Sequence, residues 1–230
     1  MAGTGWAAVI PVKRLGMAKS RLRGAVAPAR HAELALAMLS DTVAAVCDTP
    51  AVAELVVVTD DPAAADAVAA LGARVVPDGP AAGLNPAMRH GADVVVGLSR
   101  PRVVLAGDLP ALRPDELAAA LHAAAGAPAD DAAGRDGRAF VPDVAGTGTV
   151  LLAAPPGVPL APRFGPGSAH AHAASGARLL AGAWPGLRQD VDTPADLRAV
   201  LAMGAGAYTC ALWRDLGQVA DCAGPCVPAR

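Results

Sequence analysis

Three aspartates stand where short, mainly apolar segments of the chain end. Asp108 follows residues 101–107 (PRVVLAG), and Asp190 and Asp192 close the segment 186–192 (GLRQDVD). If both segments are strands, Asp190 and Asp192 project from one side of a strand, and Asp108 reaches them from the end of another. Carboxylate oxygens are the ligands that Mg²⁺ prefers, often together with substrate phosphates. The pattern predicts a magnesium site; singly, Asp192 as a helix cap and Asp108 as a turn residue are the alternatives.

A cluster of basic residues follows the first apolar segment. In KRLGMAKSRLR (13–23) the basic positions surround Gly16, and Lys13 and Lys19 are the two lysines of the whole chain. Such a loop can approach a polyphosphate closely and neutralise it, and a compact ammonium differs from the arginine fork used elsewhere. The G-x-x-x-x-G-K-[ST] spacing of a P-loop is absent. We therefore expect a polyphosphate-binding loop, with a solvated charged loop as the alternative.

Two glycine-rich loops have the composition of anion sites. GTGT (146–149) offers the hydroxyl and N–H groups of Thr147 and Thr149. RFGPGSAHAH (163–172) leads into a predicted helix that Ser168 is expected to cap, and a helix N-terminus attracts anions. Ordinary turn chemistry is the alternative for each loop.

Histidines and cysteines give no strong metal signal. His170 and His172 stand two positions apart on a predicted helix, so they do not share a face, and we expect both to face solvent. The cysteines are too few and too unevenly placed for a disulfide scaffold. We expect reduced thiols, with a metal cluster of the last three as the less favoured alternative: Cys47, Cys210, Cys222 and Cys226.

The segments that must position these residues alternate between strand and helix. Apolar runs predict strands over 6–12, 54–60, 73–78, 101–108, 139–144, 148–154 and 186–192. Helical periodicity, with caps and early prolines, predicts helices over 28–47, 61–72, 85–98, 113–125, 168–182 and 193–204. This alternation predicts one α/β domain over 1–204, with a mostly parallel sheet and helices on both faces. Ligands of such sheets bind beyond the carboxyl ends of the strands. Residues 205–230 lack periodicity and are expected to be an appended, disordered tail.

Composition excludes several classes of protein. The chain has 230 residues, 53% of them hydrophobic, with a net charge of −2 and 3% aromatic residues. It has neither the basic field nor the stacking residues of a nucleic-acid-binding protein. No run of 18 apolar residues is long enough for a membrane span, and the first apolar run precedes its basic residues, unlike a signal peptide. We expect a soluble, cytoplasmic protein.

Six segments carry a family resemblance. VIPVKRLGMAKSRL, VVTDD, GLNPAMRHGAD, LAGDLPAL, RFGPGSAHAHAASGA and DVDTPADL follow one another in this order. Together they resemble the guanylyltransferases of deazaflavin coenzyme (F-420) biosynthesis, which act on phosphoenolpyruvate or 2-phospho-L-lactate and belong to the MobA-like nucleotidyltransferases. The resemblance spans residues 6–203 and implies the single-domain, glycosyltransferase-A-like α/β fold of nucleotide-diphospho-sugar transferases.

The resemblance also implies a reaction. GMP would pass from GTP to the phosphate of a three-carbon acid, releasing pyrophosphate, with one or two Mg²⁺ ions. Phosphoenolpyruvate is the expected acceptor, because the alanine-rich, lysine-poor composition is typical of bacteria with GC-rich genomes, whose family members are associated with it. The alternatives are 2-phospho-L-lactate and 3-phosphoglycerate. The expected partners are these small molecules, and neither nucleic acid nor a membrane is expected. A second copy of the chain, forming a homodimer, is the one protein partner considered.

Roles for individual residues follow from the resemblance. The triphosphate would be neutralised by Lys13, Lys19 and Arg21, and the catalytic set would be Lys13, Lys19 and Asp108. Mg²⁺ would be held by Asp108, Asp190 and Asp192. The acceptor would be bound by Thr149, Gly165 and Ser168, with Thr147 and Gly148 as alternates. Asn85 would meet the base or ribose. No general base is needed, because a phosphate monoester is largely dianionic at neutral pH and is itself the nucleophile.

Three other functions compete with this interpretation. A molybdopterin guanylyl- or cytidylyltransferase would open with a glycine-rich LAGG-like loop, where this chain has IPVKRLG. A regulatory nucleotide-binding module that had lost catalysis would be expected to lack one of the three aspartates. A dehydrogenase of the Rossmann type would carry G-x-G-x-x-G after the first strand, which is missing.

Overall fold

A seven-stranded sheet forms the centre of the molecule. The structure is a computed structural model, and it describes residues 5–17, 26–79, 82–126 and 136–217. The strand order is β3-β2-β1-β4-β6-β5-β7. The strands are β1 (Trp6–Val12), β2 (Val52–Thr59), β3 (Arg74–Val76), β4 (Arg102–Leu105), β5 (Ala139–Pro142), β6 (Thr149–Ala154) and β7 (Arg178–Leu179).

Most strand pairs are parallel. β1 pairs in parallel with β2 and β4, β2 with β3, and β5 with β7, whereas β6 is antiparallel to both β4 and β5. The β5–β6 hairpin therefore inserts an antiparallel ribbon beside the parallel half. The prediction of a mostly parallel α/β sheet is confirmed, as is the predicted strand pair over 139–144 and 148–154.

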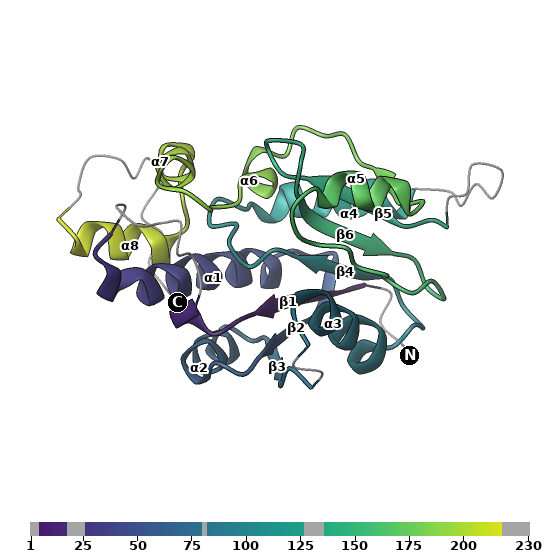
Figure 1. The fold of residues 1–230 in the computed structure, drawn as a ribbon, viewed down its shortest axis with the longest axis horizontal. Coiled ribbons are helices and arrows are strands. Elements are labelled where there is room, and N and C mark those ends of the chain that lie inside the picture. The colour runs from purple at the N-terminus through teal and green to yellow at the C-terminus, as the bar shows by residue number, and fades with distance from the viewer. Residues whose placement is uncertain (1–4, 18–25, 80–81, 127–135, 218–230) are drawn as a thin grey trace.

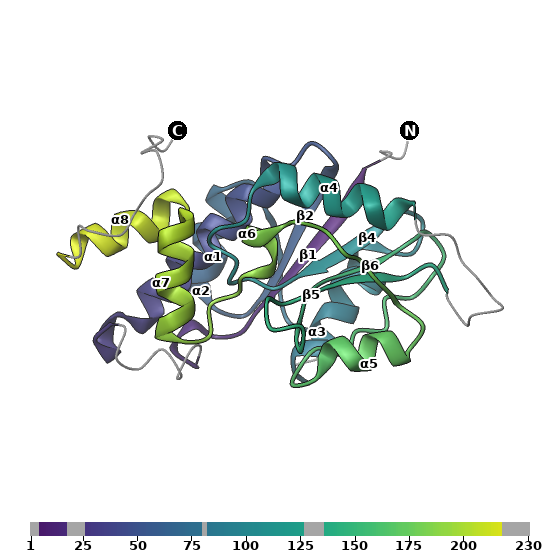
Figure 2. The same cartoon turned by 90° about the horizontal axis from the view of Figure 1, so that it is seen from above.

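Helices cover both faces of this sheet (Figure 1, Figure 2). The α-helices are α1 (His31–Cys47), α2 (Pro62–Ala70), α3 (Leu84–Arg89), α4 (Pro114–Ala125), α5 (Ser168–Ala174), α6 (Pro185–Arg188), α7 (Pro194–Met203) and α8 (Ala207–Asp215). The 3₁₀ turns η1 (Leu15–Met17) and η3 (Pro28–Arg30) precede α1, and the π-helical segment η4 (His90–Val96) continues α3.

The two faces of the sheet have separate cores. Ile10 of β1 packs with residues of α1, α2 and α4, whereas its neighbour Val9 packs with α3, η4 and α5. Alternate side chains of a strand point to opposite faces, and both faces of this strand are buried. This explains why the central strands read as continuous apolar runs rather than as alternating ones.

Two predicted elements on the C-terminal side are wrong. The segment 186–192 is not a strand: Pro185–Arg188 is the short helix α6, and residues 189–192 are irregular. The Glu116 carboxylate accepts hydrogen bonds from the backbone N–H groups of Gly186 and Leu187, and this contact stabilises the turn. The helix expected over 168–182 ends at Ala174, and β7 follows a left-handed Gly176.

The predicted C-terminal tail is corrected over its first part. Ala207–Asp215 forms α8, whose Cys210 and Trp213 are buried against α1 and α7. The buried Asp41 of α1 accepts hydrogen bonds from the first N–H groups of this helix, at Tyr208 and Thr209. Residues 218–230, with Cys222 and Cys226, lie outside the described residues.

The two described cysteines differ in their state. Cys47 carries a free thiol, but the expectation of a reduced thiol at Cys210 is wrong, because Cys210 is disulfide-bonded.

Among the described residues, none of the helices is both long and apolar enough to cross a membrane.

Candidate active site

A cavity of about 770 Å³ opens at the carboxyl ends of β1 and β4. This is where ligands of open α/β sheets bind, and the volume suits a nucleotide-sized ligand. Its walls come from the end of β1, from α1 and α3, from the turn after β4, from the β5–β6 turn, from the loop before α5 and from the segment after α6. Nearly all described residues predicted for the site line it: Lys13, Asp108, Thr147, Gly148, Thr149, Gly165, Ser168, Asp190 and Asp192.

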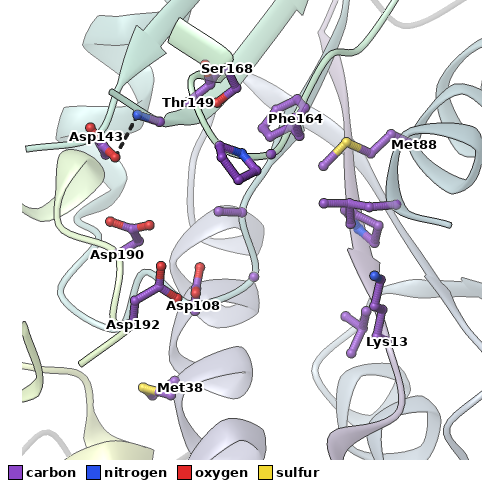
Figure 3. A pocket seen from close by; sticks show the side chains of 18 of the residues that line it. Lys13, Met38, Met88, Asp108, Asp143, Thr149, Phe164, Ser168, Asp190 and Asp192 are labelled. Carbon is purple, nitrogen blue, oxygen red and sulfur yellow. Dashed lines mark hydrogen bonds between the residues drawn. The ribbon is translucent and has the colours of Figure 1, made fainter. Parts of the chain in front are cut away.

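The three predicted aspartates share one wall (Figure 3). Backbone contacts bring their segments together, because the N–H of Val191 donates to the carbonyl of Asp108 at 3.2 Å. The N–H of Leu109 also donates to Thr42 Oγ1 of α1 at 3.0 Å and fixes the turn after β4. The prediction that these carboxylates converge agrees with this arrangement, although Asp190 and Asp192 lie on an irregular segment and not on a strand.

The carboxylates of this wall suit Mg²⁺ when substrate phosphates complete its coordination. Asp108, Asp190 and Asp192 all present carboxylate oxygens to the same cavity. Among the described residues, however, no group of three or more His, Cys, Asp or Glu side chains is arranged to hold a metal by itself. Mg²⁺ is commonly bound by one or two carboxylates and completed by substrate phosphates and water. The residues therefore fit a magnesium ion that arrives with a polyphosphate.

Lys13 lies across the cavity from the aspartates, where it extends from the end of β1 (Figure 3). The chain turns directly afterwards, and the Asp61 carboxylate accepts a hydrogen bond from the N–H of Leu15 at 2.9 Å. Asp61 also caps α2, because its carboxylate accepts a hydrogen bond from the N–H of Ala64 at 3.0 Å. The other predicted members of the basic loop, Lys19 and Arg21, lie outside the described residues.

The β5–β6 turn is organised by Asp143, a cavity residue that the sequence analysis missed. Its carboxylate accepts from the backbone N–H groups of Thr147 at 2.9 Å and of Gly148 at 2.8 Å. The Arg188 guanidinium donates to the Asp143 carbonyl at 2.9 Å. The spacing of an aspartate before the GTGT loop was the signal available, since Asp and Asn commonly bond to nearby backbone N–H groups in turns.

The loop before α5 brings Gly165 and Ser168 into the cavity. Ser168 is buried and is the first residue of α5, not its cap: the N-cap is the left-handed Gly167, with no side-chain cap hydrogen bond. The N–H of Ser168 donates to the Gly165 carbonyl at 3.1 Å, and that of Ala169 donates to the Thr147 carbonyl at 3.1 Å. The second contact joins the two glycine-rich loops into one wall.

His172 is buried, and the expectation that it faces solvent is wrong, whereas His170 is exposed as expected. Its Nδ1 lies 2.9 Å from Thr149 Oγ1, and its Nε2 accepts from the N–H of Arg163 at 2.9 Å. Burial, aided by the positive charges of Arg138 and Arg163, lowers the pKa of His172 to about 4. The imidazole is therefore neutral at physiological pH.

Asn85 does not line the cavity, and although it stands at the start of the helix expected over 85–98, it does not cap that helix. Gly83 is the N-cap of α3. The Asn85 amide donates to the Phe164 carbonyl at 2.9 Å and accepts from the Phe164 N–H at 2.7 Å. Both halves of this side chain are thus engaged in holding the loop before α5, and the contact of Asn85 with a base or ribose stays a prediction.

Solved structures similar to this one identify the class of fold. A putative nucleotide-diphospho-sugar transferase from Desulfovibrio desulfuricans G20 superposes with a TM-score of 0.65 at 16% identity, covering 93% of this chain and 96% of that one. A nucleotidyl transferase from Methanothermobacter superposes with a TM-score of 0.59 at 20% identity, covering 86% and 96%. The molecule has the nucleotidyltransferase fold.

Sequence relatives specify the family. Residues 6–223 match the family model described as "Guanylyl transferase CofC like". A phosphoenolpyruvate guanylyltransferase of Salinispora arenicola is 57% identical over 212 residues, 90% of this chain and 92% of that protein. Another from Geodermatophilus obscurus is 55% identical over 212 residues, with 90% and 93% covered. The chain belongs to the CofC-like guanylyl transferase family.

Proposed function

We propose that this chain is a phosphoenolpyruvate guanylyltransferase of deazaflavin coenzyme (F-420) biosynthesis, acting in the cytoplasm. It transfers GMP from GTP to the phosphate of phosphoenolpyruvate and releases pyrophosphate. The observation that carries the proposal is a single cavity with Lys13 on one wall, three aspartates on another, and the joined loops of Thr149 and Ser168 on a third. The names of relatives 57% and 55% identical support the same activity.

The chemical step needs positioning more than proton transfer. A phosphate oxygen of phosphoenolpyruvate attacks the α-phosphorus of GTP, and the bond from that phosphorus to the α–β bridging oxygen breaks. Pyrophosphate leaves with the bonding electron pair. The acceptor phosphate is largely dianionic at neutral pH, so no side chain has to remove a proton. Catalysis then rests on alignment of the two substrates and on neutralisation of developing charge.

The residues of the chain divide this task between them. Lys13, with Lys19 and Arg21 of the same loop, neutralises the triphosphate. Asp108, Asp190 and Asp192 would hold Mg²⁺, which would supply further positive charge to the phosphates. Thr149, Gly165 and Ser168 bind the phosphate or carboxylate of the acceptor, because together they offer hydroxyl and backbone N–H donors on one wall.

The test is pyrophosphate release from GTP and Mg²⁺ with one acceptor at a time: phosphoenolpyruvate, 2-phospho-L-lactate or 3-phosphoglycerate. ATP and CTP replace GTP as nucleotide controls. We expect release with GTP and phosphoenolpyruvate, and a loss of at least a hundredfold in Asp108→Asn. If pyrophosphate is released only with one of the other two acids, that acid is the acceptor substrate. A folded protein that binds GTP but releases nothing with any acceptor would refute the proposed reaction.

A further inference from the structure

His172 occupies a position between the two glycine-rich loops of the cavity wall. It is fully buried, and its ring packs against the rings of Phe140 and Phe164, with centroids 5.9 and 5.2 Å away. One ring nitrogen meets the Thr149 hydroxyl, and the other meets the backbone N–H of Arg163. Thr149 lines the cavity, whereas His172 does not. The histidine therefore acts on the cavity through Thr149 and through the loop that begins at Arg163.

The contact with Arg163 determines which nitrogen of His172 carries the proton. A backbone N–H can only donate, so Nε2 must be unprotonated and accept. A neutral imidazole then has its hydrogen on Nδ1, and burial keeps the ring neutral. The opposite tautomer would place two N–H groups against each other at 2.9 Å. The backbone of one loop thus fixes the polarity of the hydrogen bond to Thr149.

This polarity has a consequence for the Thr149 hydroxyl. Because Nδ1–H donates to Thr149 Oγ1, the oxygen acts as the acceptor in that bond, and its own hydrogen remains available for another partner. Within the part of the chain that the structure describes, Thr149 Oγ1 makes no second hydrogen bond. Thr149 lies beside Ser168 on the cavity wall (Figure 3). The Thr149 O–H can therefore donate a hydrogen bond to a ligand in the cavity.

We propose that His172 is a positioning residue that holds the Thr149 hydroxyl as a hydrogen-bond donor to an anionic group of the acceptor substrate. The identity of that acceptor rests on the proposed function, but the direction of the hydrogen bond does not. The same histidine also holds the loop at Arg163, so its two nitrogens serve two separate purposes. A histidine of the other tautomer would take up the Thr149 hydrogen and leave an oxygen lone pair facing an anion, which is repulsive.

The first test reads the tautomer directly in the ligand-free enzyme. Two-bond ¹H–¹⁵N correlation spectra of the histidine rings separate protonated from unprotonated nitrogens, and His172→Gln assigns the signal. At pH 7 we expect a protonated Nδ1 and an unprotonated Nε2. A protonated Nε2, or a doubly protonated ring, overturns the proposal. This measurement does not depend on which reaction the enzyme catalyses.

The second test separates the two purposes of the ring by substitution. An asparagine places its amide nitrogen near the position of Nδ1, and a glutamine places its amide near that of Nε2. We expect Thr149→Val to raise the KM for phosphoenolpyruvate about tenfold or more, the loss of one hydrogen bond to a charged group, without a matching change in the KM for GTP. Thr149→Ser recovers part of this loss. We expect the KM for phosphoenolpyruvate of His172→Asn to stay closer to the wild-type value than that of His172→Gln. When either substitution is combined with Thr149→Val, we expect the two double variants to have the same KM.

Controls keep the result distinguishable from a general structural effect. His170→Asn and His170→Gln make the same changes on the exposed side of α5 and leave both KM values unchanged. If His172→Gln preserves the KM better than His172→Asn, the ring serves to hold the loop and the proposal is overturned. If wild-type enzyme releases no pyrophosphate with phosphoenolpyruvate, the proposed function fails. The affinity of the same variants for inorganic phosphate, measured by calorimetry, then replaces the KM as the readout. We expect His172→Asn to bind phosphate more nearly as wild type does than His172→Gln; the reverse order overturns the proposal.

Discussion

Replacement of Gly148 by alanine is expected to weaken acceptor binding through one displaced carboxylate. A Cβ at this position would lie 2.4 Å from Asp143 Oδ2, well inside ordinary contact distance. The Asp143 carboxylate can rotate away, so the cost is not the clash itself but the loss of its hydrogen bonds to Thr147 and Gly148, at 2.9 and 2.8 Å. Both bonds involve a charged acceptor and are partly open to solvent, which places the combined loss at about 2 kcal/mol.

This loss has a thermal and a kinetic consequence. For a chain of this size, about 2 kcal/mol corresponds to a fall in melting temperature of roughly 4–8 °C. The released turn also carries Thr149, so we expect the KM for phosphoenolpyruvate to rise by about five- to twentyfold, while the KM for GTP changes little. The assay is thermal unfolding followed by circular dichroism, together with initial rates of pyrophosphate release.

Gly126→Ala is the matched control for this variant. Gly126 stands at the end of α4 with φ −81°, and an added Cβ would meet its nearest neighbour, the His122 carbonyl oxygen, at 3.8 Å. The same substitution there should leave both KM values and the melting temperature close to wild type. A Gly148→Ala enzyme with unchanged melting temperature and KM values would refute the role assigned to Asp143.

Three further substitutions or conditions test other contacts. Asn85→Ala removes both hydrogen bonds to Phe164, so the KM for phosphoenolpyruvate should rise; a rise confined to GTP would instead restore the predicted contact with the nucleotide. The pKa of His172 is about 4 in the folded protein, against 6.5 for an unperturbed histidine. Between these pH values the unfolded chain therefore binds more protons at this residue than the folded chain does. The free energy of unfolding is thus expected to fall as the pH drops from about 6.5 to 4. Urea unfolding should show a shallower fall in His172→Gln, and parallel curves would contradict this. Gly206→Ala would place a Cβ 2.2 Å from Asp41 Oδ1, and we expect a loss of about 3 kcal/mol, measured by urea unfolding; unchanged stability would refute the role of Asp41 in α8.

The features that could be predicted from the sequence are those that depend on neighbouring residues. The buried strands near the start of the chain are continuous apolar runs, and the capping box of Thr193 and Asp196 at α7 is a local pattern. The position of Asp108 beyond the end of β4 followed from the rule that strand ends of an α/β sheet meet at one edge. Asp190 is not on a strand, so that rule does not explain its place beside Asp108; the backbone hydrogen bond from Val191 to Asp108 does.

The features that were predicted wrongly depend on contacts with residues outside their own helix or strand. Asn85 precedes a proline and reads as a helix cap, but its partner is Phe164, 79 positions later. Helix α8 lacks a local cap because Asp41 supplies one from 167 positions away. His172 is covered by a loop whose path no periodicity reveals. Local patterns cannot show which distant group satisfies a backbone N–H, and these three errors share that cause.

The division of the cavity walls has a consequence for how substrate choice can change. The wall proposed to bind the acceptor comes from one continuous stretch, from Asp143 through β6 to His172, whereas the opposite walls combine β1, α1 and the turn after β4. Substitutions confined to this stretch would therefore change the preference for the acceptor, while the residues proposed to bind the triphosphate stay unchanged.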